Sequence, residues 1–142
     1  MMRKFCLLAV LIATPTLAAD DLRQLVKMPA PAEATFRQDM RDNIVAINEI
    51  IGLLAEGKIK ESGAVAEEKI GMGMMGRHRM LPFESRPGPH MPDAMHQLNM
   101  QTHMAGHDYA GIAASGSRDK ALAALNKVTS GCVACHLSYR IR

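Results

Sequence analysis

The chain has 142 residues, a formal net charge of +3 at pH 7, no tryptophan, three phenylalanines and two tyrosines. This length is enough for one domain, and so small a charge leaves no basic surface of the kind that binds nucleic acid. A composition poor in aromatic residues but rich in alanine, leucine and methionine is typical of an all-helical protein.

The first 18 residues have the pattern of a secretory signal peptide. Residues 3–4 are basic, residues 5–13 form an apolar run, and small residues follow up to Ala18. We expect cleavage after Ala18, which would remove Cys6 and leave residues 19–142 as one exported domain with a formal charge of about +1. The apolar run is too short to span a bilayer, and no later segment is long enough. The pattern predicts a protein of the bacterial periplasm.

Four helical segments are expected after a leader, residues 20–33, that contains Pro29 and Pro31. The first helix should cover residues 34–56 and end at Gly57. Its apolar residues follow one another at gaps of 4, 4, 3, 4 and 3, which traces one helical face. These residues are Phe36, Met40, Ile44, Ile47, Ile51 and Leu54.

The second and third helices are separated by a proline-rich loop. Residues 60–75 predict a weaker helix, because glycines interrupt its thin apolar stripe. Residues 76–92 read as the loop, and residues 92–114 as the third helix, which Gly116 ends. Its predicted buried face consists of Met95, Leu98, Thr102, Ala105, Tyr109 and Ile112.

The fourth helix, which Ser117 can cap, carries the most informative motif, Cys132-Val-Ala-Cys135-His136. Two thiols at this spacing can each add to a vinyl group of one haem, and the histidine that follows then ligates the iron as its proximal ligand. The predicted buried face of this helix consists of Leu122, Leu125, Thr129, Cys132, His136 and Tyr139. We therefore predict an all-α protein, an antiparallel four-helix bundle with one covalent haem c on the last helix.

Other uses of a C-x-x-C pair fit this chain less well. A thioredoxin-like pair follows a strand and opens a helix, whereas this pair comes late in a helical segment. A zinc site would need a second Cys or His pair at finger-like spacing, and no other cysteine would remain after cleavage. A disulfide within the motif would leave His136 without a role.

The string that runs from Cys132 through Cys135, His136 and Tyr139 to Arg140 resembles the C-x-x-C-H-x-x-Y-R string of the cytochrome c prime family. The resemblance implies an antiparallel four-helix bundle with haem near the end of the last helix, in subunits that are commonly homodimers. Arg37-Gln38 matches an Arg-Gln pair of the family's first helix, which implies that Arg37 lies near the haem propionates. Arg140, the last residue of the string, is carried over with it as a cofactor-binding residue.

The chain departs from the family on the distal side of the haem. Family members often carry Met or Leu four residues after the arginine, where this chain has Arg41. Arginine stays protonated and cannot ligate iron, so Arg41 would lie beside a propionate or donate a hydrogen bond to a bound ligand. Met40 lies on the apolar stripe, one turn from Arg37, and is our candidate for the sixth iron ligand. Ligation by Met and His raises the reduction potential.

The middle of the chain is rich in methionine and histidine. His96, Met100, His103 and His107 follow one another at gaps of 4, 3 and 4, and so form one stripe on the third helix. Two histidines at i and i+4, such as His103 and His107, can chelate one metal ion, and thioether with imidazole suits copper. Methionine also fills irregular cores and surface histidines are often only solvated. We favour this plainer interpretation.

These features predict a monohaem cytochrome that transfers electrons to or from a redox partner protein. Two alternatives stay open. The first is binding of a small gas such as nitric oxide at an open distal site, and the second is copper handling through the Met/His-rich segment. No paired carboxylates or nucleophile–base set accompanies the haem motif, so we do not expect an enzyme.

Overall fold

The computed structural model of the chain describes residues 20–142. The predicted signal peptide, residues 1–18, lies outside the described residues. Four helices make up most of the described chain, and the predicted all-α class is confirmed. They are α1 (Ala30–Ala55), α2 (Ile59–Lys69), α3 (Asp93–Ala113) and α4 (Arg118–Ser138).

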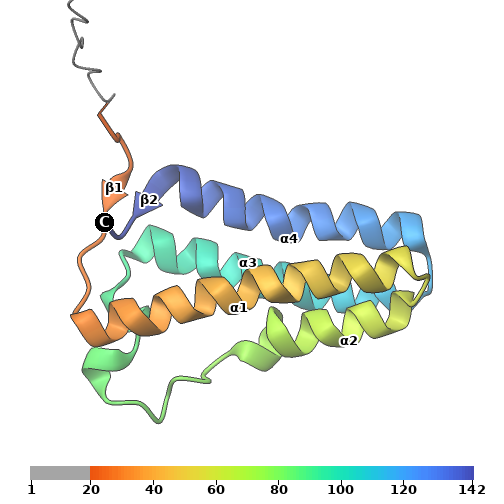
Figure 1. Ribbon diagram of the computed structural model, residues 1–142, viewed down its shortest axis with the longest axis horizontal. Helices are drawn as coiled ribbons and strands as arrows, with labels where there is room; N and C mark the ends of the chain where they lie inside the picture. Colours follow the sequence, from red (N-terminus) through yellow and green to blue (C-terminus); the bar gives the residue numbers. More distant parts are fainter. Residues whose placement is uncertain (1–19) are drawn as a thin grey trace, which may run out of the picture.

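Helices that follow one another in the chain pack against one another. α1 contacts α2, α2 contacts α3, and α3 contacts α4, whereas α1 and α4 make few close backbone contacts. Figure 1 shows the helices running side by side along the long axis of the molecule. No helix within residues 20–142 is long and apolar enough to cross a membrane.

Two short strands join the beginning and the end of the described chain. β1 (Gln24–Leu25) runs parallel to β2 (Tyr139–Arg140), with Gln24 opposite Tyr139 and Leu25 opposite Arg140. The amide of Val26 extends the pairing by donating to the carbonyl of Arg140 at 2.8 Å. This pairing fixes the residues that directly follow α4, beside the C-terminus in Figure 1.

The first helix begins four residues earlier than predicted, at Ala30 instead of 34. Pro31 lies in its first turn, where the missing amide hydrogen costs no helical hydrogen bond and the fixed φ suits a helix. The helix ends at Gly57 as predicted. The φ of Gly57 is +79°, and the amide of Lys58 bonds back to the carbonyl of Leu53 at 2.9 Å, which together cap the helix end.

The second helix is shorter than predicted, because it ends at Lys69 instead of continuing to Met75. A 3-10 turn, η1 (Met72–Met74), replaces the last predicted turns. Gly71 and Gly73 make this stretch a poor helix, and Gly71 lies against α3, where a Cβ on Gly106 would come within 3.0 Å of its backbone nitrogen. The segment continues through the 3-10 turns η2 (Phe83–Ser85) and η3 (Gly88–His90).

The last helix starts where predicted, after Gly116, whose φ is +73°. Ser117 occupies the N-cap position, but its side chain makes no capping hydrogen bond. The predicted side-chain cap is therefore wrong, although the helix boundary is right.

All four helices contribute to one large hydrophobic cluster, which we call the main core. Its largest members are Ile50, Leu54, Ile59, Ile70, Tyr109, Leu125 and Val128. Three large apolar residues predicted to be buried are exposed instead: Ile44 (66%), Ile51 (51%) and Leu122 (48%). The buried line runs through neighbouring residues instead, such as Ala46 and Ile50 on α1 and Ala121 on α4.

A buried polar pair links α2 and α3 within the main core. The hydroxyls of Ser62 and Tyr109 lie 2.7 Å apart, and both residues are 0% exposed. Ser62 donates its hydrogen to the carbonyl of Ile59 at 2.6 Å, so Tyr109 must be the donor in the pair. Burial raises the pKa of Tyr109, because the phenolate would be poorly solvated there.

We expect Ser62→Ala to destabilise the protein more than Tyr109→Phe does. The first change leaves a buried phenol without an acceptor and should lower the free energy of unfolding by about 1–3 kcal/mol. The second leaves Ser62 bonded to Ile59 and should cost about 0.5–1.5 kcal/mol. Urea unfolding measures both, with the exposed Ser115→Ala as control, and the reverse order would contradict the assigned donor.

Candidate functional site

The C-x-x-C-H motif lines a cavity of about 380 Å³ between α1, α3 and α4, which we call the motif cavity. Its size lies in the range typical of small-molecule sites, about 300–1,000 Å³. Mostly apolar side chains form its walls: Phe36, Met40, Ile44 and Ile47 from α1, Met95 and Thr102 from α3, and Cys132, Val133, Cys135 and His136 from α4. The cavity occupies the side of the molecule where α1 and α4 make few close contacts.

The motif cavity also interrupts the hydrophobic interior. A second cluster, which we call the end cluster, consists of Val26, Phe36 and Met95, with Met40, Cys135 and Tyr139 among the residues packed against it. Phe36 of the end cluster and Ile47, which packs on the main core, both line the cavity. An apolar ligand in the cavity would therefore join the two clusters into one core.

The two cysteines continue the buried line of α4. Val128 is 1% exposed, and Cys132 and Cys135 follow it at helical spacing, each partly buried. His136 lies beside this line and is exposed, although it lines the cavity. The prediction that His136 lies on the buried stripe with Cys132 is therefore wrong, because the buried line follows Ala121, Ala124 and Val128.

Both cysteines are free thiols with raised pKa values. Burial is the main cause for each thiol, and Cys132 adds to it for Cys135. A thiol of this kind is mostly protonated at neutral pH, whereas the reactive thiol of a thioredoxin-like pair has a lowered pKa. The raised pKa values of Cys132 and Cys135 are therefore not those expected of a thioredoxin-like pair.

Gly131 lets α4 approach α3 closely next to the motif. A Cβ at this position would overlap the side chain of Thr102 on α3. The absence of a side chain here holds Cys132 close to α3, and so sets the width of the cavity on that side.

A second hollow, of about 450 Å³, adjoins the motif cavity. Phe36, Met40, Met95, Cys135 and His136 line both spaces. We call this space the arginine hollow, because five arginines line it: Arg23, Arg37, Arg41, Arg140 and Arg142.

Two carboxylates partly balance these arginines. Asp21 lies 2.7 Å from Arg23 and 3.5 Å from Arg140, while Glu33 lies 2.9 Å from both Arg37 and Arg142. The hydrogen bond from Arg23 is the main cause that lowers the pKa of Asp21 to about 2, and hydrogen bonds from Arg142 and Arg37 lower the pKa of Glu33. Five guanidinium groups against two carboxylates leave an excess of positive charge.

Arg140 has unused capacity to bind an anion. Its Nε is buried, and within residues 20–142 it has no hydrogen-bond partner, since its approach to Asp21 does not have hydrogen-bond geometry. A buried donor without a partner is unusual in a folded protein. An acceptor that enters the hollow would satisfy it.

The structure brings most of the predicted site residues together. Arg37, Met40 and Arg140 line the arginine hollow with Cys135 and His136, and Cys132 lines the motif cavity next to it. Sequence reasoning did not find Arg23 and Arg142, which enter the site through the β1–β2 pairing, and it left out Met95 although that residue was placed on the buried face of the third helix.

His103 and His107 each make a contact of their own through Nδ1, and only His103 lines a cavity with other candidate metal ligands. The Nδ1 of His107 lies 2.8 Å from Glu67 Oε2, and the Nδ1 of His103 lies 2.6 Å from the carbonyl of Ile70. Within residues 20–142, no group of three or more His, Cys, Asp or Glu side chains is arranged to hold a metal ion.

Comparison of the chain with models of protein families, with curated proteins and with solved structures finds no match. Its function must therefore be inferred from its own residues and their arrangement.

Proposed function

We propose that this chain is a c-type haem protein with one covalent haem. The observation that carries the proposal is the position of the C-x-x-C-H motif, which lines an apolar cavity that adjoins an arginine-rich hollow. Haem is divided in the same way as this site: its macrocycle is apolar, and its two propionate carboxylates lie at one edge. Cys132 and Cys135 would form the thioether bonds, and His136 would be the proximal iron ligand.

The residues around the motif fit such a group. Bound haem would supply an iron atom that changes its oxidation state by one electron. Phe36 and Met95 would keep water from the ring, and the unpartnered Nε of Arg140, together with Arg37, would bind propionate oxygens. Ile44 and Val133, 66% and 56% exposed at the cavity wall, would gain an apolar neighbour.

Within this class we propose a protein similar to the cytochromes c prime. The four helices, with the motif near the end of α4, are compatible with that family's antiparallel four-helix bundle. Arg41 lines the arginine hollow and donates to Gln38 Oε1 at 2.6 Å, which is compatible with a place beside a propionate. We further propose that the protein is exported to the bacterial periplasm.

For the activity we propose electron transfer with a redox partner protein. Met40 favours it over gas binding, because this thioether side chain lines both spaces that His136 lines. A methionine on the iron would fill the site that a gas needs. The alternative, binding of a small gas such as nitric oxide, requires the distal side of the iron to stay open.

An absorption spectrum of the purified protein in both oxidation states tests this proposal. A low-spin, six-coordinate spectrum in both states is the result expected of an electron carrier. A high-spin, five-coordinate spectrum would instead favour gas binding. A protein without haem absorption, after expression with haem-maturation machinery, would contradict the whole assignment.

A further inference from the structure

A third cavity, of about 220 Å³, lies between α1, α3 and the segment that links α2 to α3; we call it the loop cavity. It shares Phe36, Met40, Asn43, Met91 and Asn99 with the motif cavity, but most of its wall is separate. Thioether and imidazole side chains gather on that separate part: Met74, Met75, Met100, His78, His96 and His103.

Core packing accounts for two methionines of the loop cavity, Met40 and Met91, but not for the other three. Met28, Met40, Met91 and Met95 belong to the end cluster or pack against it. Met74, Met75 and Met100 belong to neither hydrophobic cluster and pack against neither. Their sulfur atoms are therefore available for a role other than filling the interior.

His103 is held in the orientation of a metal ligand. Its Nδ1 lies 2.6 Å from the carbonyl oxygen of Ile70, which can only accept, so Nδ1 carries the hydrogen. In the neutral ring, Nε2 is then an acceptor, and it receives a hydrogen bond from the amide nitrogen of Asn99 in the cavity wall at 3.2 Å, which a metal would replace. Metal-binding histidines commonly donate their other ring N–H to a carbonyl or carboxylate in this way.

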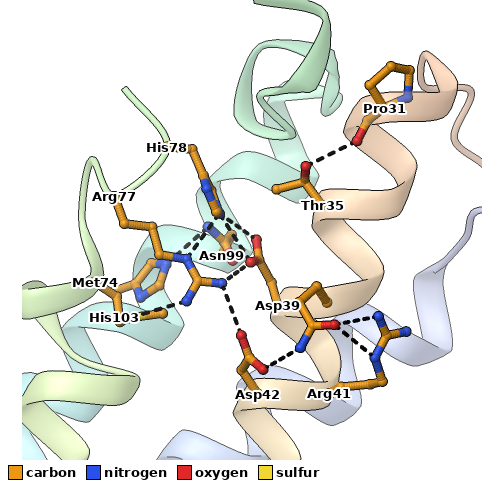
Figure 2. Close-up of polar contacts among 11 residues, drawn as sticks. Pro31, Thr35, Asp39, Arg41, Asp42, Met74, Arg77, His78, Asn99 and His103 are labelled. Carbon is orange, nitrogen blue, oxygen red and sulfur yellow. Dashed lines mark hydrogen bonds and ion pairs between the residues drawn. The ribbon is translucent and has the colours of Figure 1, made fainter. Parts of the chain in front are cut away.

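A positively charged side chain already lies among donor groups in this cavity. Figure 2 shows the guanidinium of Arg77 between Asp39, Met74 and His78. It forms an ion pair with Asp39, its Nη1 lies 3.5 Å from the Met74 sulfur, and its Nε lies 3.0 Å from His78 Nε2. Arg77 follows Gly76, whose φ is +73°, at a turn of the linking segment. Asp42 Oδ2 lies 3.9 Å from the Nη2 of Arg77, so two carboxylates, a thioether and an imidazole surround one cation.

We propose that the loop cavity binds one Cu(I) ion through the sulfur atoms of Met74 and Met100 and the Nε2 of His103, and that Arg77 leaves the cavity when the metal enters. Thioether and imidazole are soft, neutral ligands that suit Cu(I). Asp39, released by Arg77, then balances the charge of the metal. His107 takes no part, because it does not line this cavity.

Anaerobic titration with Cu(I) against a chromogenic chelator tests the site. The full chain carries Cys132→Ser and Cys135→Ser, and also Cys6→Ser where residues 1–18 are retained, so that free thiols cannot bind the metal and the result does not depend on haem. Haem-loaded parent protein is titrated in parallel. If the serine variant does not fold, this second titration still tests the site. One Cu(I) per chain is expected in both proteins.

Variants distinguish a metal in the loop cavity from a metal bound by the pair His103 and His107 on α3. Met74→Leu, Met100→Leu and His103→Ala should each weaken binding by at least about tenfold. Arg77→Gln should strengthen it, because no guanidinium has to be displaced. Met104→Leu and His107→Ala, on the same helix but outside the cavity, are the controls and should not change the affinity.

Three results would overturn the proposal. One is the absence of Cu(I) binding in both proteins. Another is a loss of affinity in His107→Ala as large as that in His103→Ala, since the metal would then be bound by the pair His103 and His107 instead of by the loop cavity. The third is weaker or unchanged binding in Arg77→Gln, which would exclude displacement of the arginine.

Discussion

Purified after coexpression with haem-maturation machinery, the chain should have an intact mass one haem above that of the polypeptide, and acid–acetone extraction should leave the haem attached. Both effects follow from two thioether bonds at the motif. Replacing Cys132 and Cys135 together by Ala should abolish attachment. Val133→Ala, which changes an exposed residue within the motif and keeps its spacing, should not.

His136→Ala separates attachment from iron ligation. The haem should stay bound to the cysteines, while the spectrum should lose the signature of a strong proximal ligand. A parent protein at the mass of the polypeptide alone would contradict the assignment. So would an unchanged spectrum in His136→Ala.

Met40→Ala should convert a low-spin, six-coordinate haem to a high-spin, five-coordinate one and lower the midpoint potential, because a thioether ligand favours the reduced iron. Absorption spectra and a redox titration measure the two effects. Met40→Leu keeps most of the side-chain volume without the sulfur and should act in the same way, which distinguishes lost ligation from lost packing.

Met95→Leu is the matched control for this assignment. Met95 lines both spaces as Met40 does, but it is 2% exposed and belongs to the end cluster. We expect no change of spin state in this variant. If the spin state changed in Met95→Leu but not in Met40→Ala, Met95 would be the sixth ligand. If the parent protein were already five-coordinate, neither methionine would be a ligand.

Periodicity predicted the existence of the four helices but not all of their ends or faces. The helical period of apolar residues is a strong local signal, and it placed α1, α3 and α4 well. α2 was predicted too long because Ile70 and Met74 continued its stripe, while the glycines between them decided the end. Ile44 and Ile51 were predicted to be buried because they continue the stripe of large apolar residues, whereas the face that packs into the main core runs through Ala46, Ile50 and Leu54.

Some residues of the candidate site could likewise be predicted from the sequence, and others could not. Residues of the contiguous motif could be found from local spacing, Arg37 from the resemblance to the cytochrome c prime family, and Met40 from its place on the apolar stripe one turn from Arg37. Arg23 and Arg142 could not, because only the pairing of β1 with β2 brings them to the same hollow. The joining of Met74 with His103 likewise depends on how the linking segment folds over α1 and α3.

The pairing of β1 with β2 has a consequence for the order in which the molecule assembles. It joins residues from opposite ends of the described chain, and contacts between distant positions form late, because the loop between them must lose entropy first. The helices should therefore be in place before Arg23 reaches the arginine hollow. A group that reacts with Cys132 and Cys135 before that step would therefore meet the site before Arg23 joins it.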